Sequence, residues 1–239
     1  MELRGASALV TGAGRGIGRA IAVALGGAGA SVTVVSRTQR ELEETARAVE
    51  AAGGRAAVHA GDVRRRADCD AAIARAVDAH GGLQVLVNNA GIGSHGPIAE
   101  TSDEQWSDVL ETNVGAAFRL TRAALPHLAK KGGHVFMISS LAGKNAIAGM
   151  AAYCASKAAL DHFAECLMLE VRYDGIKVTT IAPGSVDTSF GRDDGKTRGE
   201  SWMLTAQDVA DMVVGVASAR DAALQSRVEM RPLRPQKRA

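Results

Sequence analysis

Short apolar runs alternate along this chain with longer segments whose apolar residues recur at helical spacing. Runs of this kind, rich in Val, Ile and Ala, predict strands that are covered on both faces, as parallel strands are. Strands separated so regularly by helices predict a doubly wound α/β fold, with about seven parallel strands flanked by helices on both faces. The expected strands are Ser7–Thr11, Ser31–Ser36, Ala56–Ala60, Val85–Val87, His134–Ser139, Val178–Ile181 and Arg227–Met230.

The helices are placed by amphipathic spacing and by N-cap signals. In the longest of them Asn113 is a polar residue whose side chain competes for backbone bonds, so it either distorts the helix or is simply tolerated. The expected helical segments are Arg19–Leu25, Gln39–Ala52, one from about Arg64, a long one from Asp103 to about Lys130, Met150–Gly175, and one from Thr205 to about Ala219.

Composition narrows the class of protein. The chain has 239 residues, 46% hydrophobic and 3% aromatic, enough for one domain with an aliphatic core. A net charge of +2 does not favour binding to nucleic acid or to a membrane surface, and no apolar run approaches a membrane span. Three scattered cysteines lack metal spacing and suit a reducing compartment. The N-terminus leaves no room for a signal peptide, so we expect a cytoplasmic protein. We expect no bound metal, since the cysteines lack the spacing of metal ligands.

A glycine-rich turn joins the first strand to the first helix. Gly12–Gly18 reads Gly-Ala-Gly-Arg-Gly-Ile-Gly, which does not fit the G-x-G-x-x-G register. It still offers free N–H groups and close backbone approach to a pyrophosphate at a helix N-terminus. The alternative is a merely flexible turn. We expect a single NAD(P)-binding Rossmann domain over residues 1–239.

The end of the second strand bears on the choice of cofactor. In NAD-binding folds an acid at this point holds the adenosine ribose, but here Ser36 and Arg37 follow the strand with no acid nearby in the sequence. Arg15 in the glycine turn is a second basic group that can face the same spot. Two guanidinium groups and a hydroxyl suit a 2′-phosphate, so NADP(H) is favoured over NAD(H) unless both arginines are merely solvated.

Two further strand ends carry polar groups. Asp62 follows the third strand and either accepts from an adenine amino group or caps the next helix, two roles that are compatible. Asn88-Asn89-Ala90-Gly91 follows the fourth strand, where side-chain amides can hold the backbone beside a cofactor.

Candidate chemistry lies between Ser140 and Lys157. Tyr153 and Lys157 are four residues apart on one helix face, so the ammonium can lower the phenol pKa towards neutrality. Ser140 ends a buried strand at the edge where such sheets bind ligands. An acid, its electrostatic activator and a hydroxyl donor are the groups needed to reduce or form a carbonyl.

The last third of the chain supplies the predicted substrate side. Pro183-Gly184 terminates the sixth strand and opens a gap at the ligand edge. Residues 188–204 are polar and glycine-punctuated, which indicates a mobile lid over the substrate. The basic tail 231–239 is expected to be a solvated end or a subunit contact.

With these motifs in order, the chain resembles the short-chain dehydrogenase/reductase family from about Gly5 to Met230. The motifs are Thr11–Gly18, Asp62, Asn88–Gly91, Asn113, Ser140, Tyr153 with Lys157, and Pro183-Gly184 followed by Thr188. Each alone is weak, but their joint occurrence in this order is specific. Spacing to Tyr153 assigns the catalytic place to Ser140 rather than to the adjacent Ser139.

The resemblance implies a role for each catalytic residue. Tyr153 is the acid in reduction and the base in oxidation, Lys157 holds the nicotinamide ribose, Ser140 binds the substrate oxygen, and Asn113 supports a water-linked proton path. It also implies a homotetramer that pairs through the Asn113 and Tyr153 helices. The expected cofactor contacts are Gly12, Gly14, Arg15, Gly16, Ile17, Gly18, Ser36, Arg37, Asp62, Val63, Asn89, Ala90, Gly91, Tyr153, Lys157, Pro183, Gly184, Val186 and Thr188.

Substrate contacts are expected from Ile92, Ser94, His95, Leu141 and Ser185, although a loop histidine such as His95 is often simply solvated. The predicted activity is NADPH-dependent reduction of a ketone or 3-oxoacyl group. The alternatives are a secondary-alcohol dehydrogenase and a non-catalytic NADPH-binding sensor or scaffold. Two features depart from the family pattern. The carboxyl end lacks the Gly-rich closing segment that is common in the family. Asp174 stands where reductases of carrier-bound ketoacyl groups often have a basic residue, which weakens the case for an acyl-carrier-protein substrate.

Overall fold

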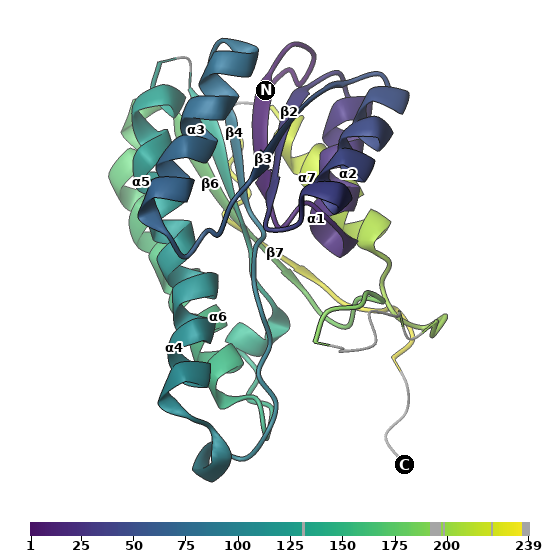
Figure 1. Cartoon of the computed structure of the whole chain (residues 1–239), viewed down its shortest axis with the longest axis vertical. Helices are drawn as coiled ribbons and strands as arrows, with labels where there is room; N and C mark the ends of the chain where they lie inside the picture. Colours follow the sequence, from purple (N-terminus) through teal and green to yellow (C-terminus); the bar gives the residue numbers. More distant parts are fainter. Residues whose placement is uncertain (131, 192–196, 198, 221, 236–239) are drawn as a thin grey trace.

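A seven-stranded parallel sheet forms the centre of the computed structural model (Figure 1). The structure describes residues 1–130, 132–191, 197, 199–220 and 222–235. The strand order is β3-β2-β1-β4-β5-β6-β7. The order reverses between β1 and β4, which creates the crevice where doubly wound sheets bind ligands. The strands are β1 Ser7–Thr11, β2 Ser31–Ser36, β3 Arg55–Ala60, β4 Val85–Asn88, β5 Gly133–Ile138, β6 Ile176–Pro183 and β7 Arg227–Met230.

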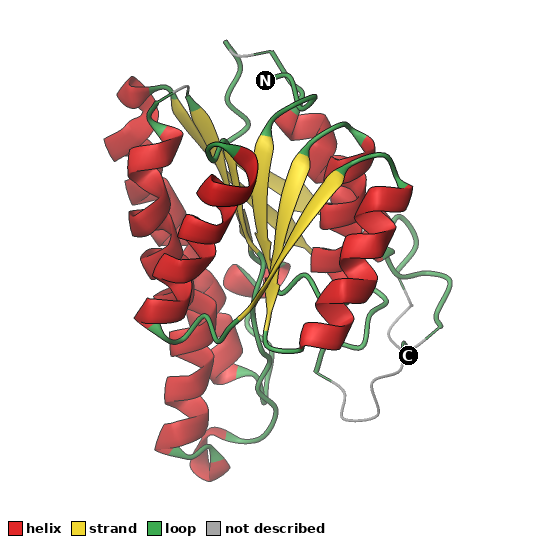
Figure 2. Cartoon of the chain, turned by 45° about the horizontal axis from the view of Figure 1, so that its top comes forward, coloured by secondary structure: helices red, strands yellow, loops and turns green. Residues whose placement is uncertain are grey.

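Helices cover both faces of this sheet, as Figures 1 and 2 show. One core cluster joins the sheet to α1, α2 and α7, and the other joins it to α3, α5 and α6. The predicted fold class is therefore confirmed. The α-helices are α1 Gly16–Gly27, α2 Gln39–Ala51, α3 Arg66–His80, α4 Asp103–Leu110, α5 Ala116–Leu128, α6 Ala151–Val171 and α7 Ala206–Ala217, and the shorter helical turns are η1 Ile98–Glu100, η2 Glu111–Gly115, η3 Leu141–Gly143 and η4 Arg172–Asp174.

The central strand shows how the sequence builds the sheet. Every residue of β1 is buried, and its side chains alternate between the two cores, with Leu9 in one cluster and Val10 in the other. This is why the apolar run is continuous rather than alternating. The N-cap predictions are also confirmed: Ser102 and Thr205 each form a capping box, with Gln105 and Asp208 respectively.

The long helix predicted from Asp103 to about Lys130 is interrupted. A π-helical turn, η2, separates α4 from α5 and contains Asn113. The Asn113 side chain bonds outside its own helix, so the expected distortion is present and the alternative of a tolerated residue is not. Four strands are also longer or shifted relative to the sequence prediction: β3, β4, β5 and β6. No helix in the described part of the chain is both long and apolar enough to cross a membrane.

His134 is a fully buried histidine on β5. Its Nε2 lies 2.7 Å from Thr179 Oγ1, and that hydroxyl donates to the Gln225 carbonyl at 2.7 Å. The threonine proton is thus used, so His134 Nε2 donates and Nδ1 is the unprotonated nitrogen. Burial lowers the pKa of His134 to about 3, and the charges of Lys177 and the N-terminal ammonium act in the same direction.

This histidine predicts a specific pH dependence of stability. Below its ordinary pKa of 6.5 the unfolded chain binds a proton that the folded chain excludes down to about pH 3, so stability is lost as pH falls through that window. The loss reaches about 1.4 kcal/mol per pH unit. His134→Gln keeps a donor for Thr179, and we expect its denaturant-unfolding free energy to fall less steeply than that of the wild type between pH 6.5 and about 4.5. Equal slopes would contradict this account.

Candidate active site

The candidate site lies where the carboxyl ends of β1, β4, β5 and β6 meet. Thr11, the last residue of β1, donates through its hydroxyl to the Val87 carbonyl and accepts from the N–H groups of Asn89 and Ala90. Asn89 returns a bond of 2.8 Å from its amide to the Thr11 carbonyl. Asn88 bonds through its amide to the Thr121 hydroxyl. The Asn89 amide thus fixes the ends of β1 and β4 against each other, while the Asn88 amide ties the end of β4 to α5.

The glycine turn brings the N-terminus of α1 against this edge. A Cβ on Gly18 would collide with the Gly12 carbonyl and lie 2.5 Å from the amide nitrogen of Asn89. Only a glycine permits this approach. A Cβ on Gly16 would lie 3.6 Å from Thr188, so the turn also faces the loop after β6. The cradle therefore fits the pyrophosphate of a dinucleotide, with the N–H groups of a helix N-terminus open towards it.

Lys157 and Asn113 lie together beneath Gly91. A Cβ on Gly91 would be 3.1 Å from Asn113 Oδ1 and 3.7 Å from Lys157 Nζ. The ammonium donates to the Ile138 carbonyl at 2.8 Å, and burial lowers the pKa of Lys157 to about 8, while Asp161 acts in the opposite direction. At neutral pH this lysine is charged and faces the end of β5.

The π turn aims the Asn113 amide at the loop after β4. Its Oδ1 accepts from the Ile92 N–H at 2.8 Å, and its Nδ2 donates to the Ile92 carbonyl at 3.0 Å and to the Ser156 hydroxyl at 2.9 Å. Asn113 thereby holds the loop to α6 next to Lys157.

Ser140 and Tyr153 face each other across the site. The Ser140 hydroxyl accepts from Ala142 N–H at 3.1 Å and lies close enough to the Tyr153 phenol to lower the phenol pKa, against the larger effect of burial. The neighbouring Ser139 is buried and points to the Lys157 carbonyl at 3.5 Å. The two serines therefore differ in place: Ser140 lies near the Tyr153 phenol, whereas Ser139 faces the backbone of α6.

The prediction that Lys157 lowers the pKa of Tyr153 is wrong. Burial raises the pKa of Tyr153 above its ordinary 10.0, and the Ser140 hydroxyl only partly opposes it. Lys157 Nζ is 5.7 Å from the centre of the phenol ring and is engaged by the Ile138 carbonyl. Helical spacing gave the right neighbours but not the desolvation, so Tyr153 is a protonated phenol at neutral pH.

The adenosine end holds a carboxylate that the sequence prediction missed. A Cβ on Gly14 would lie 2.7 Å from an oxygen of Glu41 and 3.1 Å from the Ser36 hydroxyl. The expectation that no acid lies near this point is therefore wrong. Glu41 is in the first turn of α2, which folds back over the glycine turn. Arg15 in the glycine turn and Arg37 after β2 are both exposed.

Asp62 already has a strong partner. Its carboxylate binds the Arg64 guanidinium at 2.7 Å and accepts from the Arg64 N–H at 3.0 Å, and this contact lowers the pKa of Asp62. Arg37 acts on it in the same direction. The helix α3 begins only at Arg66, so Asp62 stabilises the turn before the helix rather than capping it. Val63 follows Asp62 in this turn, and its carbonyl accepts from the Cys69 thiol.

Two of the predicted substrate residues, Ser94 and His95, lie near Tyr153 and near the segment after Thr188 respectively. Ser94 accepts from the Tyr153 N–H at 3.3 Å. His95 is exposed, and its Nε2 would be 3.1 Å from a Cβ on Gly191. Phe190, which the sequence prediction did not single out, is half-exposed with its ring 5.7 Å from that of Tyr153. His95 therefore faces the start of the predicted lid.

The predicted lid is anchored at both ends. Val186 pairs with Leu204 in an isolated bridge, and the Leu204 N–H donates to the Ser185 carbonyl. Pro183 ends β6, and the Gly184 N–H donates to Met230 of β7. A Cβ on Gly184 would be 3.1 Å from Leu141, so these two predicted contacts are adjacent. Residues 192–196 and 198 of the lid and 236–239 of the tail lie outside the described part of the chain.

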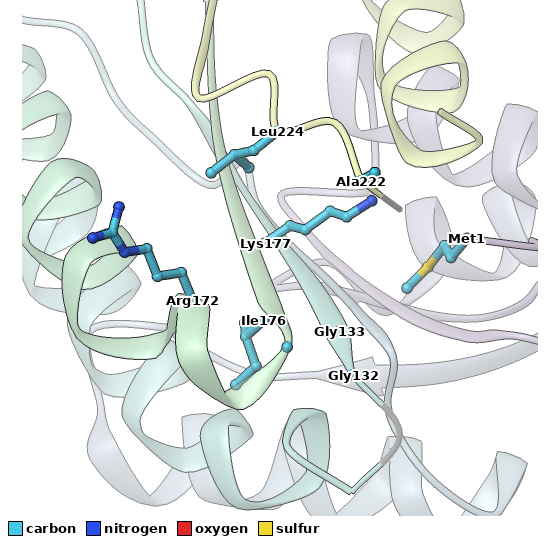
Figure 3. Close-up of a pocket in the computed structure, with 9 residues that line it drawn as sticks. Met1, Gly132, Gly133, Arg172, Ile176, Lys177, Ala222 and Leu224 are labelled. Atoms are coloured by element: carbon cyan, nitrogen blue, oxygen red, sulfur yellow. The ribbon is translucent and has the colours of Figure 1, made fainter. Parts of the chain in front are cut away.

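A cavity of about 360 Å³ lies at the opposite edge of the sheet (Figure 3). Its walls include the first residues of β5 and β6, so it is separated from the carboxyl ends that carry the candidate residues. Lys177 extends across it towards Met1 and Ala222, while Arg172 points away (Figure 3). It contains none of the residues predicted for catalysis.

Comparison with known proteins agrees with this geometry. A model of the short chain dehydrogenase family matches residues 6–199. Among its relatives, the ketoacyl reductase HetN of a Nostoc species is 40% identical over 185 residues, which are 77% of this chain. The aligned residues make up 64% of HetN, so this chain spans less than two thirds of the length of that relative.

Two solved structures share the fold over almost the whole chain. An alcohol dehydrogenase from Thermococcus sibiricus, complexed with 5-hydroxy-NADP, has a TM-score of 0.90 at 26% identity and covers 97% of this chain and 99% of its own. A metagenomic short-chain oxidoreductase in complex with NADP has a TM-score of 0.86 at 36% identity, covering 98% and 100%. This chain belongs to the short-chain dehydrogenase family and is an oxidoreductase of that family.

The Asn113 contacts predict a large loss of stability on truncation. Asn113→Ala leaves the partly buried Ile92 N–H and carbonyl without the side chain to which they bond. Each such orphan costs about 1–3 kcal/mol, so we expect a loss of about 2–4 kcal/mol in the free energy of unfolding. Chemical denaturation measures it, with Asn145→Ala on an exposed loop as the control. A loss below about 1 kcal/mol would show that the loop does not depend on Asn113.

Proposed function

We propose that this protein reduces a ketone or 3-oxoacyl carbonyl to a secondary alcohol with NADPH. The observation that carries the proposal is the convergence of Ser140, Tyr153 and Lys157 at the carboxyl edge, with Tyr153 held as a protonated phenol by burial. A protonated phenol is the form that donates to a carbonyl oxygen as negative charge develops on it. The ketoacyl reductase HetN is among its relatives, which supports the substrate class.

Each residue has a defined task in this proposal. NADPH, when bound in the glycine cradle, supplies the hydride to the carbonyl carbon. The Ser140 hydroxyl binds the carbonyl oxygen, and Tyr153 donates the proton to it. Lys157 holds the nicotinamide ribose, and Asn113 supports the path by which a proton returns through water. The remaining predicted cofactor contacts, from Gly12 to Thr188, form the walls of the cradle.

The reverse reaction and a binding-only role are the alternatives. In reduction the protonated Tyr153 phenol is the donor, whereas in alcohol oxidation the same residue acts as the base after it has lost that proton. A sensor that binds NADPH without turnover has no use for a phenol, a hydroxyl and a buried ammonium set together. The exposed Asp174 after α6 supports a small or thioester substrate rather than docking of an acyl carrier protein.

NADP(H) is the cofactor that we propose, on the balance of charge at the adenosine end. Arg15 and Arg37 are exposed and available to a 2′-phosphate, and Ser36 offers a hydroxyl. Glu41 opposes them from beside Gly14. Two cations outweigh one carboxylate for a dianionic group, and two structural relatives are complexes with NADP or a hydroxy derivative of it.

We also propose a homotetramer in the cytoplasm. Apolar side chains on the helices named for pairing support the assembly: Trp106 on α4, Phe118 on α5 and Leu169 on α6 are 37%, 45% and 56% exposed. Burial of such side chains between subunits is favourable. Light scattering of the purified protein distinguishes a tetramer from a monomer.

Removal of the phenol tests the catalytic assignment. We expect Tyr153→Phe to lower kcat at least about 100-fold, the usual contribution of a positioned acid, while the affinity for NADPH changes less than about threefold. Single-turnover assays over a panel of ketones and 3-oxoacyl thioesters measure the first effect, and fluorescence titration measures the second. The exposed Tyr173, changed to Phe, is the matched control. Substantial turnover by Tyr153→Phe would remove Tyr153 from the mechanism.

A pair of variants with opposite expected effects tests the cofactor preference. Arg37→Asp should shift binding towards NADH, because a carboxylate repels the 2′-phosphate and accepts from ribose hydroxyls. Glu41→Gln should tighten NADPH about fivefold, the effect of about 1 kcal/mol from one partly exposed charge, and leave NADH nearly unchanged. Titration of each variant with both nucleotides gives the ratios. If neither variant changes the ratio, the phosphate does not bind at this point.

A further inference from the structure

A charged network lies behind the catalytic helix and has no role in the function proposed above. Arg227 on β7 binds Asp161 on α6, with 2.9 Å between Nη1 and Oδ2, and both side chains are largely buried, 21% and 8% exposed. Arg227 Nε also binds Glu229 Oε1 at 3.2 Å. Glu229 in turn pairs with Lys144 and, at 2.9 Å, with Arg231. Its pKa is lowered to about 2, chiefly by Lys144.

A contribution to the stability of the fold does not explain this network. A buried ion pair seldom stabilises a fold more than well-packed apolar residues do. Here one oxygen of Asp161, Oδ1, and one nitrogen of Arg227, Nη2, have no hydrogen-bond partner among the described residues. A buried carboxylate with an unsatisfied oxygen costs free energy, so its position calls for another reason.

The position of Asp161 supplies that reason. It follows Lys157 by four residues in α6, one turn further along the same face. Burial alone lowers the pKa of Lys157, and Asp161 is the charged group that opposes this. The titratable and charged groups around the ammonium in the described part of the chain are the neutral Tyr153 phenol and the Asp161 carboxylate from α6, with Arg227, Glu229 and Lys144 behind Asp161.

The same carboxylate contacts the turn that follows Ser140. A Cβ on Gly143 would lie 2.5 Å from Asp161 Oδ2 and 3.1 Å from the Lys157 carbonyl. The next residue, Lys144, pairs with Glu229. The network therefore holds two segments at once: the helix that carries Tyr153 and Lys157, and the turn that carries Ser140.

We propose that Asp161, held by Arg227, is a positioning residue for the catalytic set: its carboxylate keeps the buried Lys157 ammonium charged and seats the Ser140 turn against α6. The proposal rests on the proposed function, because it assigns Lys157 a catalytic charge. It gives β7 a part in catalysis, since the strand contributes no residue that touches the site but supplies the guanidinium that orients Asp161.

The first test measures the charge on Lys157 directly, without cofactor or substrate. Lysine side chains labelled with ¹³C at Cε are titrated by NMR, and the Lys157 signal is assigned by its loss in Lys157→Met. We expect Asp161→Asn to lower the Lys157 pKa by about one unit from its value near 8. Glu165→Gln, an exposed acid on the same helix paired only loosely with His162, is the matched control and should leave it unchanged.

The second test follows turnover. With a Lys157 pKa one unit lower, the charged fraction at pH 8 falls from about one half to about one tenth, so kcat/KM at that pH falls about fivefold and the alkaline limb of the pH profile moves down by about one unit. Glu165→Gln keeps the wild-type profile. If no carbonyl is turned over by the wild type, the proposed function fails, and the NMR titration still decides the role of Asp161.

A double variant separates positioning from structure. Asp161→Asn leaves Arg227 buried without its partner and should lower the melting temperature, whereas Asp161→Asn with Arg227→Gln removes both charges and should recover it. In the double variant the Lys157 pKa should stay low. Recovery of both stability and the Lys157 pKa would show that the pair is only structural, and an unchanged Lys157 pKa in both variants would overturn the proposal.

Discussion

The buried ammonium of Lys157 is the constraint on which the candidate site depends. A lysine inside a protein costs several kcal/mol unless polar groups surround its charge. This fold supplies the Ile138 carbonyl at 2.8 Å and the carboxylate of Asp161 one helical turn away. The pKa of Lys157 is therefore about 8, so the ammonium is charged near neutral pH. The end of β5, the helix α6 and the π turn around Asn113 must all hold their places for this to persist.

The parallel sheet explains why these parts meet. Each crossover returns the chain so that successive strands end at the same edge, and the residues after β1, β4, β5 and β6 become neighbours. A few residues at the strand ends then fix the geometry of the site. The hydroxyl of Thr11 ties two strand ends, and Gly18 admits a helix N-terminus that any side chain would exclude. The site is thus a consequence of topology together with a few small residues.

Patterns of short range were the part of this structure that could be predicted. The bounds of β1 and β2 follow from their apolar and β-branched runs alone, and the distortion at Asn113 follows from its competing amide. What could not be predicted needs the third dimension. Glu41 reaches Gly14 only because α2 folds back over the turn, and Arg227 meets Asp161 only because β7 closes the sheet. A sign for Asp161 did exist, its spacing of four from Lys157.

The pKa of Tyr153 shows why neighbours alone mislead. Helical spacing predicted a cation beside the phenol, and a cation is present, but desolvation acts on the phenolate more strongly than a distant ammonium does. The same competition operates at the adenosine end, where Arg37 is accompanied by the carboxylate of Glu41. At both places the sequence shows a cation, but the fold adds a second factor: burial of the Tyr153 phenol in one case and the carboxylate of Glu41 in the other. Charge at this site is therefore a property of packing, and a substitution that changes the packing of α2 or β7 changes chemistry several residues away.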